Sequence, residues 1–163
     1  MGIRTPAITF LAISGVIVLL TACAPTSSLA AGDPAKRTIY MAAIEPKGST
    51  TTAKEPFPTS QLPSGGGYIL KAPNKEGTWE VSTYRYFPST VVINQGDEVT
   101  LEIVGINGKE HATAIEGYNV QFSVLRGQVS RATFKADKAG IFNIVCTTHR
   151  PSMTAQLTVL PRP

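Results

Sequence analysis

Short apolar runs that alternate with polar residues dominate the chain from Thr78 onward. In "TWEVSTYRYFP", "TVVINQGDEVTLEIVGING", "VSRATFKAD" and "TAQLTVLP", β-branched and aromatic residues recur in alternation, and turn residues such as Gln95-Gly96-Asp97 and Asn107-Gly108 separate the runs. None of these segments keeps a helical period. Strands in this succession, without helices between them, predict an all-β fold: an antiparallel β-sandwich with Greek-key connections.

The first 22 residues have the order of a secretory signal peptide. Arg4 precedes an apolar run from Ala7 to Leu20, and small residues follow. A retained membrane anchor is the alternative, but the run is shorter than the roughly 20 apolar residues that a spanning helix needs. The residues "LTAC", which end at Cys23, resemble the lipobox of bacterial lipoproteins, although a plain signal peptide with a chance cysteine would also fit. We therefore expect an exported protein on the periplasmic side of the cell envelope, attached to a lipid membrane through acylated Cys23.

Residues 23–67 lack a sustained apolar period. Pro, Ser, Thr, Gly and Lys are frequent in "EPKGSTTTAKEPFPTSQLPSGGG", which is typical of a flexible linker. The pattern permits a short strand around Ile39 to Ile44. The sequence thus predicts a lipoprotein signal peptide at 1–22, a flexible tether at 23–67 and one folded domain at 68–163.

Charge and cysteine content narrow the possible functions. The net charge is only +4, and the basic residues are scattered, so we expect no nucleic-acid partner. The chain has two cysteines. If Cys23 carries lipid, Cys146 is left without a disulfide partner, and a lone thiol in an oxidising compartment needs burial or a metal to protect it.

A cysteine, a histidine and a methionine fall together near the C-terminus, although the chain has only two Cys, two His and three Met. Cys146, His149 and Met153 follow the spacing C-x2-H-x3-M between the last two predicted strands. A thiolate, an imidazole and a thioether suit copper better than a hard cation. A mononuclear electron-transfer copper site needs a second imidazole, and His111, just after the Asn107-Gly108 turn, is the other histidine of the chain.

The segment "GIFNIVCTTHRPSM", with "EHATAIEGYNV" upstream and "FKADKAG" between them, resembles the cupredoxin family over roughly Thr78 to Leu160. The resemblance implies a cupredoxin-like sandwich that holds one copper ion, cycling between Cu(I) and Cu(II). It also implies the ligands: His111, Cys146 and His149 in the equatorial plane and Met153 on the axis.

The residues around these positions are most similar to the periplasmic copper domain of cytochrome oxidase subunit two and to nitrosocyanin. The oxidase domain has a second bridging cysteine where this chain has Arg150, so a binuclear centre cannot form. Nitrosocyanin has a glutamate in place of His111, so the expected site moves toward blue copper. Blue-copper proteins usually have an asparagine where this chain has Ala112, so hydrogen bonding near the thiolate must differ.

The resulting hypothesis is transfer of single electrons between redox proteins, with a membrane oxidase or reductase as the natural partner and with no enzymatic activity. His149, in the exposed loop, would be the exit edge for the electron. A copper carrier or storage protein is the alternative, which the low methionine content disfavours. Catalysis would need an open coordination position or a second metal, and no further His or Cys is left to build one. A metal-free adhesive sandwich would leave the clustering unexplained.

Overall fold

The computed structural model describes residues 1–2, 33–62 and 66–162, and within these ranges the regular structure is entirely β. No helix of this part is long and apolar enough to cross a membrane. The strands are β1 (Lys36–Ile44), β2 (Lys47–Thr51), β3 (Tyr68–Lys71), β4 (Thr78–Thr83), β5 (Arg85–Phe87), β6 (Thr90–Asn94), β7 (Glu98–Gly105), β8 (Glu110–Ile115), β9 (Val120–Leu125), β10 (Val129–Lys135), β11 (Gly140–Cys146) and β12 (Thr154–Leu160).

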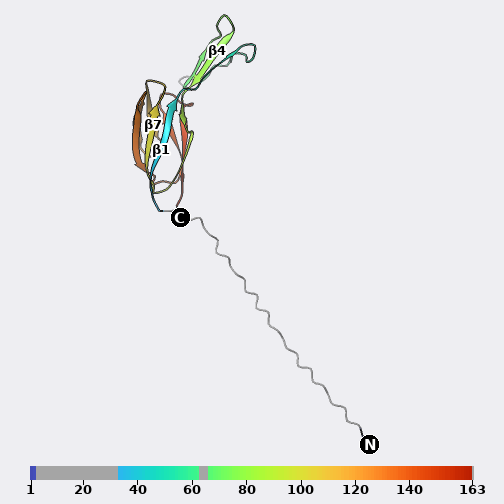
Figure 1. The fold of residues 1–163 in the computed structure, drawn as a ribbon, viewed down its shortest axis with the longest axis vertical. Helices are drawn as coiled ribbons and strands as arrows, with labels where there is room; N and C mark the ends of the chain where they lie inside the picture. Colours follow the sequence, from blue (N-terminus) through green and yellow to red (C-terminus); the bar gives the residue numbers. More distant parts are fainter. Residues whose placement is uncertain (3–32, 63–65, 163) are drawn as a thin grey trace.

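Two sheets form a sandwich, and a third sheet projects from one end of it (Figure 1). The sandwich sheets have the strand orders β10-β7-β1-β5 and β6-β12-β11-β8-β9, and the projecting sheet has the order β2-β4-β3. Neighbouring strands are antiparallel except for two parallel pairs, β1 with β7 and β6 with β12. The predicted all-β sandwich is therefore confirmed.

The core lies between the two sandwich sheets. In β7, Val99, Leu101 and Ile103 are fully buried and alternate with more exposed residues, as expected for a strand with one face on the core. Ile144 of β11 and Leu157 of β12 meet them from the other sheet and are fully buried too. The period-2 pattern seen in the sequence thus marks the strand faces that pack.

The predicted flexible tether at 23–67 is wrong for residues 36–51, because β1 and β2 lie there. β1 lies inside the four-stranded sheet, parallel to β7 and antiparallel to β5, with Met41 and Ala43 buried. The strand permitted around Ile39 to Ile44 is present and begins at Lys36. Its apolar run from Ile39 to Ile44 is short, and a charged start and a stretch rich in Pro, Ser, Thr and Gly flank it, so the sequence signal was weak. The folded part therefore begins well before residue 68, while residues 3–22 of the predicted signal peptide and Cys23 lie outside the described residues.

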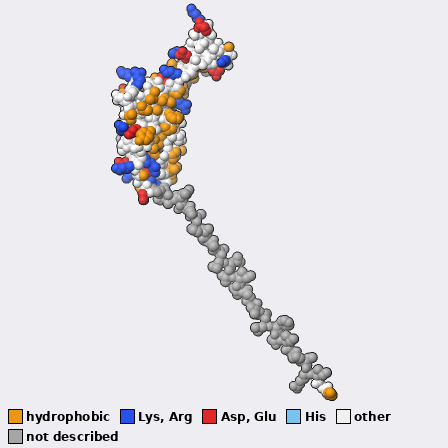
Figure 2. All heavy atoms as spheres, in the orientation of Figure 1, with side chains coloured by type: hydrophobic (Ala, Val, Ile, Leu, Met, Phe, Trp, Pro, Cys, Tyr) orange, Lys and Arg blue, Asp and Glu red, His pale blue; other side chains and the backbone are white. Residues whose placement is uncertain are grey.

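The outer face of the four-stranded sheet carries an apolar row. Val129, Val104, Ala42 and Phe87 are register partners in turn across β10, β7, β1 and β5, and both end members are exposed. Figure 2 shows hydrophobic side chains gathered over the sandwich in this view. Cross-strand apolar contacts of this kind stabilise neighbouring strands, including the short edge strand β5.

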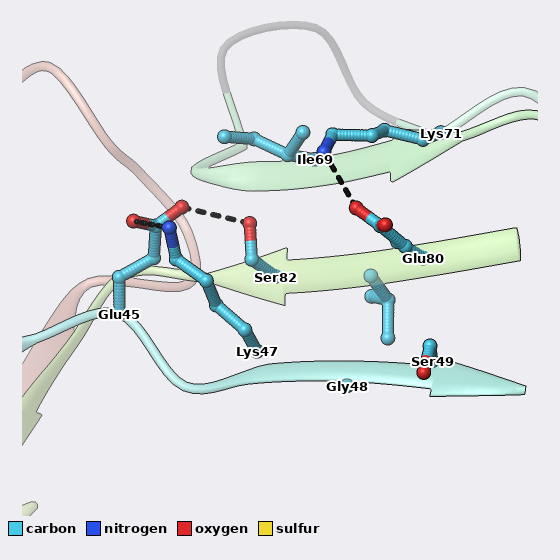
Figure 3. Close-up of a pocket in the computed structure, with 9 residues that line it drawn as sticks. Glu45, Lys47, Gly48, Ser49, Ile69, Lys71, Glu80 and Ser82 are labelled. Carbon is cyan, nitrogen blue, oxygen red and sulfur yellow. Dashed lines mark hydrogen bonds and ion pairs between the residues drawn. The ribbon is translucent and has the colours of Figure 1, made fainter.

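Polar side chains on one face of the projecting sheet, and a tryptophan near its other end, make the contacts that hold this sheet together. Glu45 accepts a hydrogen bond from the Ser82 hydroxyl at 2.8 Å and pairs with Lys47, and Lys71 pairs with Glu80 across the neighbouring strands (Figure 3). Near the other end of the sheet, the indole of Trp79 donates to a backbone carbonyl of the 52–58 segment at 3.0 Å. These contacts hold β2, β4 and β3 together beyond the sandwich.

Asp97 fixes the end of the sandwich opposite the projecting sheet. Its buried carboxylate pairs with Arg37 and with Arg162 and accepts the N–H groups of Ala35 and Asn94. Burial alone would raise the pKa of Asp97, but these hydrogen bonds and the Arg37 charge lower it to about 2. The start of β1 and the end of the chain are thereby tied to one carboxylate.

Candidate metal centre

Two neighbouring strands bring His111, Cys146 and His149 to the same end of the sandwich. His111 is the second residue of β8 and Cys146 is the last residue of β11, and these strands are antiparallel partners, with Cys146 opposite Thr113. The beginning of one antiparallel strand lies beside the end of its partner. His149 follows in a tight turn, where its N–H donates to the carbonyl of Cys146 at 3.2 Å.

The three side chains form a triangle of possible metal ligands. His149 Nδ1 lies 3.3 Å from His111 Nδ1 and 3.3 Å from Cys146 Sγ, and the remaining side, from Cys146 Sγ to His111 Nδ1, is 4.0 Å. The point equidistant from the corners of such a triangle is about 2.1 Å from each. Metal–nitrogen and metal–sulfur bonds in tight protein sites measure about 2.0 to 2.3 Å. The geometry therefore fits a single ion of that size.

The tautomer of His111 is set by the backbone. Its Nε2 donates to the carbonyl oxygen of Asn107 at 2.8 Å, and a carbonyl can only accept, so Nε2 carries the proton. In the neutral ring, Nδ1 then has a free lone pair, and it is this atom that faces Cys146 and His149. The ring is fully buried, so its orientation is held from all sides.

The electrostatics favour a thiolate at Cys146, which is buried and not in a disulfide. Burial alone would raise the pKa of the thiol, but His111 and the backbone N–H groups of Thr148 and His149 lower it below its usual value. The pKa of His111 is raised: burial opposes the charged ring, but the hydrogen bonds to Cys146 and Asn107 outweigh it. Burial and the neighbouring His111 both lower the pKa of His149. The thiolate and a neutral His149 are the forms that bind a metal ion.

The backbone ties the two ligand loops together where Ala112 replaces the asparagine of blue-copper proteins. The N–H of Thr147 donates to the carbonyl of Ala112 at 2.9 Å, and the Thr147 hydroxyl donates to the same oxygen at 3.3 Å. This backbone connection links the strand of His111 to the loop of His149 without an asparagine side chain.

Met153 closes the loop that carries His149. Its N–H donates to the His149 carbonyl at 2.9 Å, and its own carbonyl accepts the N–H of Cys146 at 2.9 Å. The residue is fully buried in the core cluster. Met153 is thus bonded through its backbone to two of the predicted ligands, and axial ligation by its sulfur stays a prediction.

Three further residues lie beside the site: Tyr84 and Gly67, which the sequence does not indicate, and Gly108, which the sequence indicates only as part of a turn. The Tyr84 ring lies 4.3 Å from the His149 ring and 5.2 Å from the His111 ring, centroid to centroid. Both glycines have positive φ and approach a histidine so closely that a Cβ would collide with it. The sequence held no signal for these contacts, since Gly67 ends a run typical of linkers and Tyr84 sits in an ordinary alternating run.

A groove of about 670 Å³ opens beside the site between the projecting sheet and the ligand loop. His149 and Tyr84 form part of its wall, together with Tyr68, Ile69 and Leu70 of β3. His149 is partly exposed there, whereas His111 and Cys146 are fully buried. The site therefore has one edge that reaches solvent, as expected for His149.

Comparisons with known proteins identify the fold. No family model matches the chain. The chain is 41% identical over 58 residues to a nitrous-oxide reductase of Cupriavidus necator. This stretch covers 34% of this chain and 9% of the reductase. Among solved structures, a copper nitrite reductase from Nitrosomonas europaea is similar with a TM-score of 0.50 and 17% identity, covering 77% of this chain and 42% of that one. The multicopper oxidase mgLAC has a TM-score of 0.50 and 16% identity, covering 78% and 40%. The chain spans less than half the length of each of these proteins.

Proposed function

Because the chain has a cupredoxin-like fold in which one cysteine sulfur and two imidazoles converge, we propose that it is a mononuclear copper protein that carries single electrons between redox partners. Cys146 Sγ and the Nδ1 atoms of His111 and His149 would hold the ion. The observation that carries the proposal is the triangle of these three atoms, whose centre is one metal–ligand bond length from each corner. Copper supplies a one-electron couple and prefers this soft and borderline donor set.

The way the ligands are held supports electron transfer over copper delivery. His111 is buried and bonded to Asn107, Cys146 ends a core strand, and the His149 loop is closed through Met153. A site whose ligands are fixed by packing and hydrogen bonds changes little when the charge of its metal changes. A carrier, by contrast, must release its ion.

The proposal includes no enzymatic activity. Among the residues that the structure describes, His111, Cys146 and His149 are the one group of His, Cys, Asp or Glu side chains that comes close enough to hold a metal ion. The proposal therefore places one metal centre in this part of the chain.

The proposal also covers location and partners: export, lipid attachment at Cys23 and exchange of electrons with a membrane oxidase or reductase. β1 starts at the Asp97 end of the sandwich and runs parallel to β7 toward the Asn107 turn. A chain anchored at Cys23 would therefore enter the domain at the end away from the metal site. The partly exposed edge of His149 would be left free to meet a partner.

Loading the purified full-length chain with Cu(II) tests the proposal. We expect uptake of one equivalent, an intense thiolate-to-copper absorption near about 600 nm and narrow hyperfine splitting in electron paramagnetic resonance. Cys146→Ser abolishes the band, and the matched control Cys23→Ser keeps it. A colourless protein with ordinary cupric signals would contradict the proposal and leave a carrier role to be examined.

A further inference from the structure

Tyr84 forms an aromatic cluster with the two imidazoles of the proposed copper site. Its ring lies 4.3 Å from the ring of His149 with 31° between their planes, and 5.2 Å from the ring of His111 with 65° between their planes. The two imidazoles are 5.2 Å apart at 64°. Tyr84 is thus a third ring packed against the other two, although it is not itself a candidate ligand.

The backbone of Tyr84 is fixed at the junction between two sheets. It stands between β4, in the projecting sheet, and β5, at the edge of the four-stranded sheet. Its N–H donates to the carbonyl of Gly67 at 3.0 Å. A residue held by strands on both sides has little freedom to move its ring away from the site.

The same junction is bonded to the loop that carries His149. Gly67 approaches so closely that a Cβ there would lie 2.8 Å from the His149 carbonyl oxygen, and the N–H of Ser152 donates to the carbonyl of Gly66 at 3.2 Å. The projecting sheet therefore reaches the metal site at two points, through the Tyr84 ring and through the Gly66-Gly67 backbone.

Tyr84 also lies between the buried part of the site and the groove. It lines the groove together with His149, and its ring contacts His111, which is fully buried. Removing the ring would join the groove to the space beside the imidazoles. A small anion in the groove would then have a path to a metal ion bound by the three ligands.

We propose that Tyr84 is a positioning residue of the metal centre, which keeps the His149 ring oriented with Nδ1 toward Cys146 and excludes outside ligands from the side of the site that faces the groove. The inference rests on the proposed copper site. Aromatic ring pairs of this kind favour one arrangement over others by a factor of roughly two to twelve. Exclusion of outside ligands keeps copper in an electron-transfer role, because a copper ion with an open position binds small anions.

Azide binding to the copper-loaded full-length chain tests the exclusion. The variants are Tyr84→Ala, Tyr84→Leu, which keeps an apolar side chain without the ring, and Tyr84→Phe as the matched control. We expect Tyr84→Ala and Tyr84→Leu to bind azide more tightly than the wild-type chain by a factor of roughly two to twelve, with broadened copper hyperfine splitting, and Tyr84→Phe to behave as the wild type. Equal azide affinity and identical spectra in all four proteins would overturn the role of Tyr84. A wild-type chain that lacks the thiolate band overturns the copper site itself, so the two failures are distinguishable.

A second readout needs no metal. The chain contains two histidines, both in the site, so the imidazole nuclear magnetic resonance signals of the metal-free protein report on the site alone. We expect the order parameter of the His149 ring to fall in Tyr84→Ala and Tyr84→Leu and to stay at the wild-type value in Tyr84→Phe. Unchanged ring order in both ringless variants, with the methyl signals of the core intact, would contradict the positioning role.

Discussion

Replacing Gly108 by alanine should displace the imidazole of His111. A Cβ at this position would lie 2.7 Å from both Cε1 and Nε2 of the ring, whereas ordinary contacts begin at 3.4 Å. Either the Gly108 backbone or the His111 ring must therefore move by about 0.7 Å. The ring is fully buried and donates to Asn107 at 2.8 Å. A shift of this size breaks or lengthens that hydrogen bond and changes the direction of Nδ1.

The magnitude follows from two contributions. The φ of Gly108 is +74°, and an alanine in that conformation costs about 1 to 2 kcal/mol. The weakened hydrogen bond of a buried ring adds about 1 kcal/mol. We therefore expect the free energy of unfolding of the metal-free protein to fall by about 2 to 3 kcal/mol. Affinity for copper should fall by about 10- to 100-fold, as is typical when the group that orients a metal-binding histidine is lost.

The chain offers a matched control in Gly127, which has a φ of +75° and no atom within 4 Å of an added Cβ. Gly127→Ala carries the same backbone strain, of about 1 to 2 kcal/mol, without the collision. Urea unfolding of the metal-free variants and competitive copper titration measure both quantities. If Gly108→Ala and Gly127→Ala have the same copper affinity, the orienting role of the Asn107–His111 contact is refuted.

Two further predictions concern the other glycine and the far end of the sandwich. In Gly67→Ala the new Cβ pushes on the backbone of His149, so we expect weaker copper binding and a shifted visible spectrum. In the control Gly48→Ala the new Cβ has an ordinary contact at 3.9 Å, so copper binding and spectrum should stay unchanged. Equal effects of the two variants would contradict the close packing at Gly67. The pKa of Asp97 is lowered from 3.8 to about 2, so its carboxylate stabilises the fold above about pH 4 and loses that contribution as the pH falls through 2. We therefore expect the difference in free energy of unfolding between the wild type and Asp97→Asn, measured by urea unfolding, to shrink by about 2 kcal/mol from pH 5 to pH 2. A constant difference would show that the charge of Asp97 does not stabilise the fold.

Two of the three side chains that meet at the candidate site could be predicted from a local signal. Cys146 and His149 are three residues apart, and the alternating run that ends at Cys146 marks the end of a core strand. His111 could be included because it is the other histidine of the chain, and its place after a turn is compatible with the same end of the sandwich. The structure adds the register of β8 against β11, which brings the three side chains together.

Other parts depend on contacts between distant segments, which one sequence does not display. The apolar run of β1, from Ile39 to Ile44, is short and is followed by a stretch rich in Pro, Ser, Thr and Gly, so the sequence only permits a strand there. The place of β1 in the sheet is set by its partners β7 and β5 and by Asp97. Gly67 and Tyr84 lie where the projecting sheet meets the site, and neither a glycine at the end of a linker-like run nor an aromatic residue in an alternating run signals such a contact. The pattern of apolar residues predicts which faces pack, but not which distant strands become neighbours.

X-ray absorption at the copper edge of the loaded full-length chain tests the central claim most directly, because it measures the atoms bound to the metal. The account predicts one copper ion with one sulfur ligand at about 2.3 Å or slightly less and two nitrogen ligands at about 2.0 Å, with the sulfur lost in Cys146→Ser. A copper ion coordinated by nitrogen and oxygen alone in the wild-type chain would contradict it.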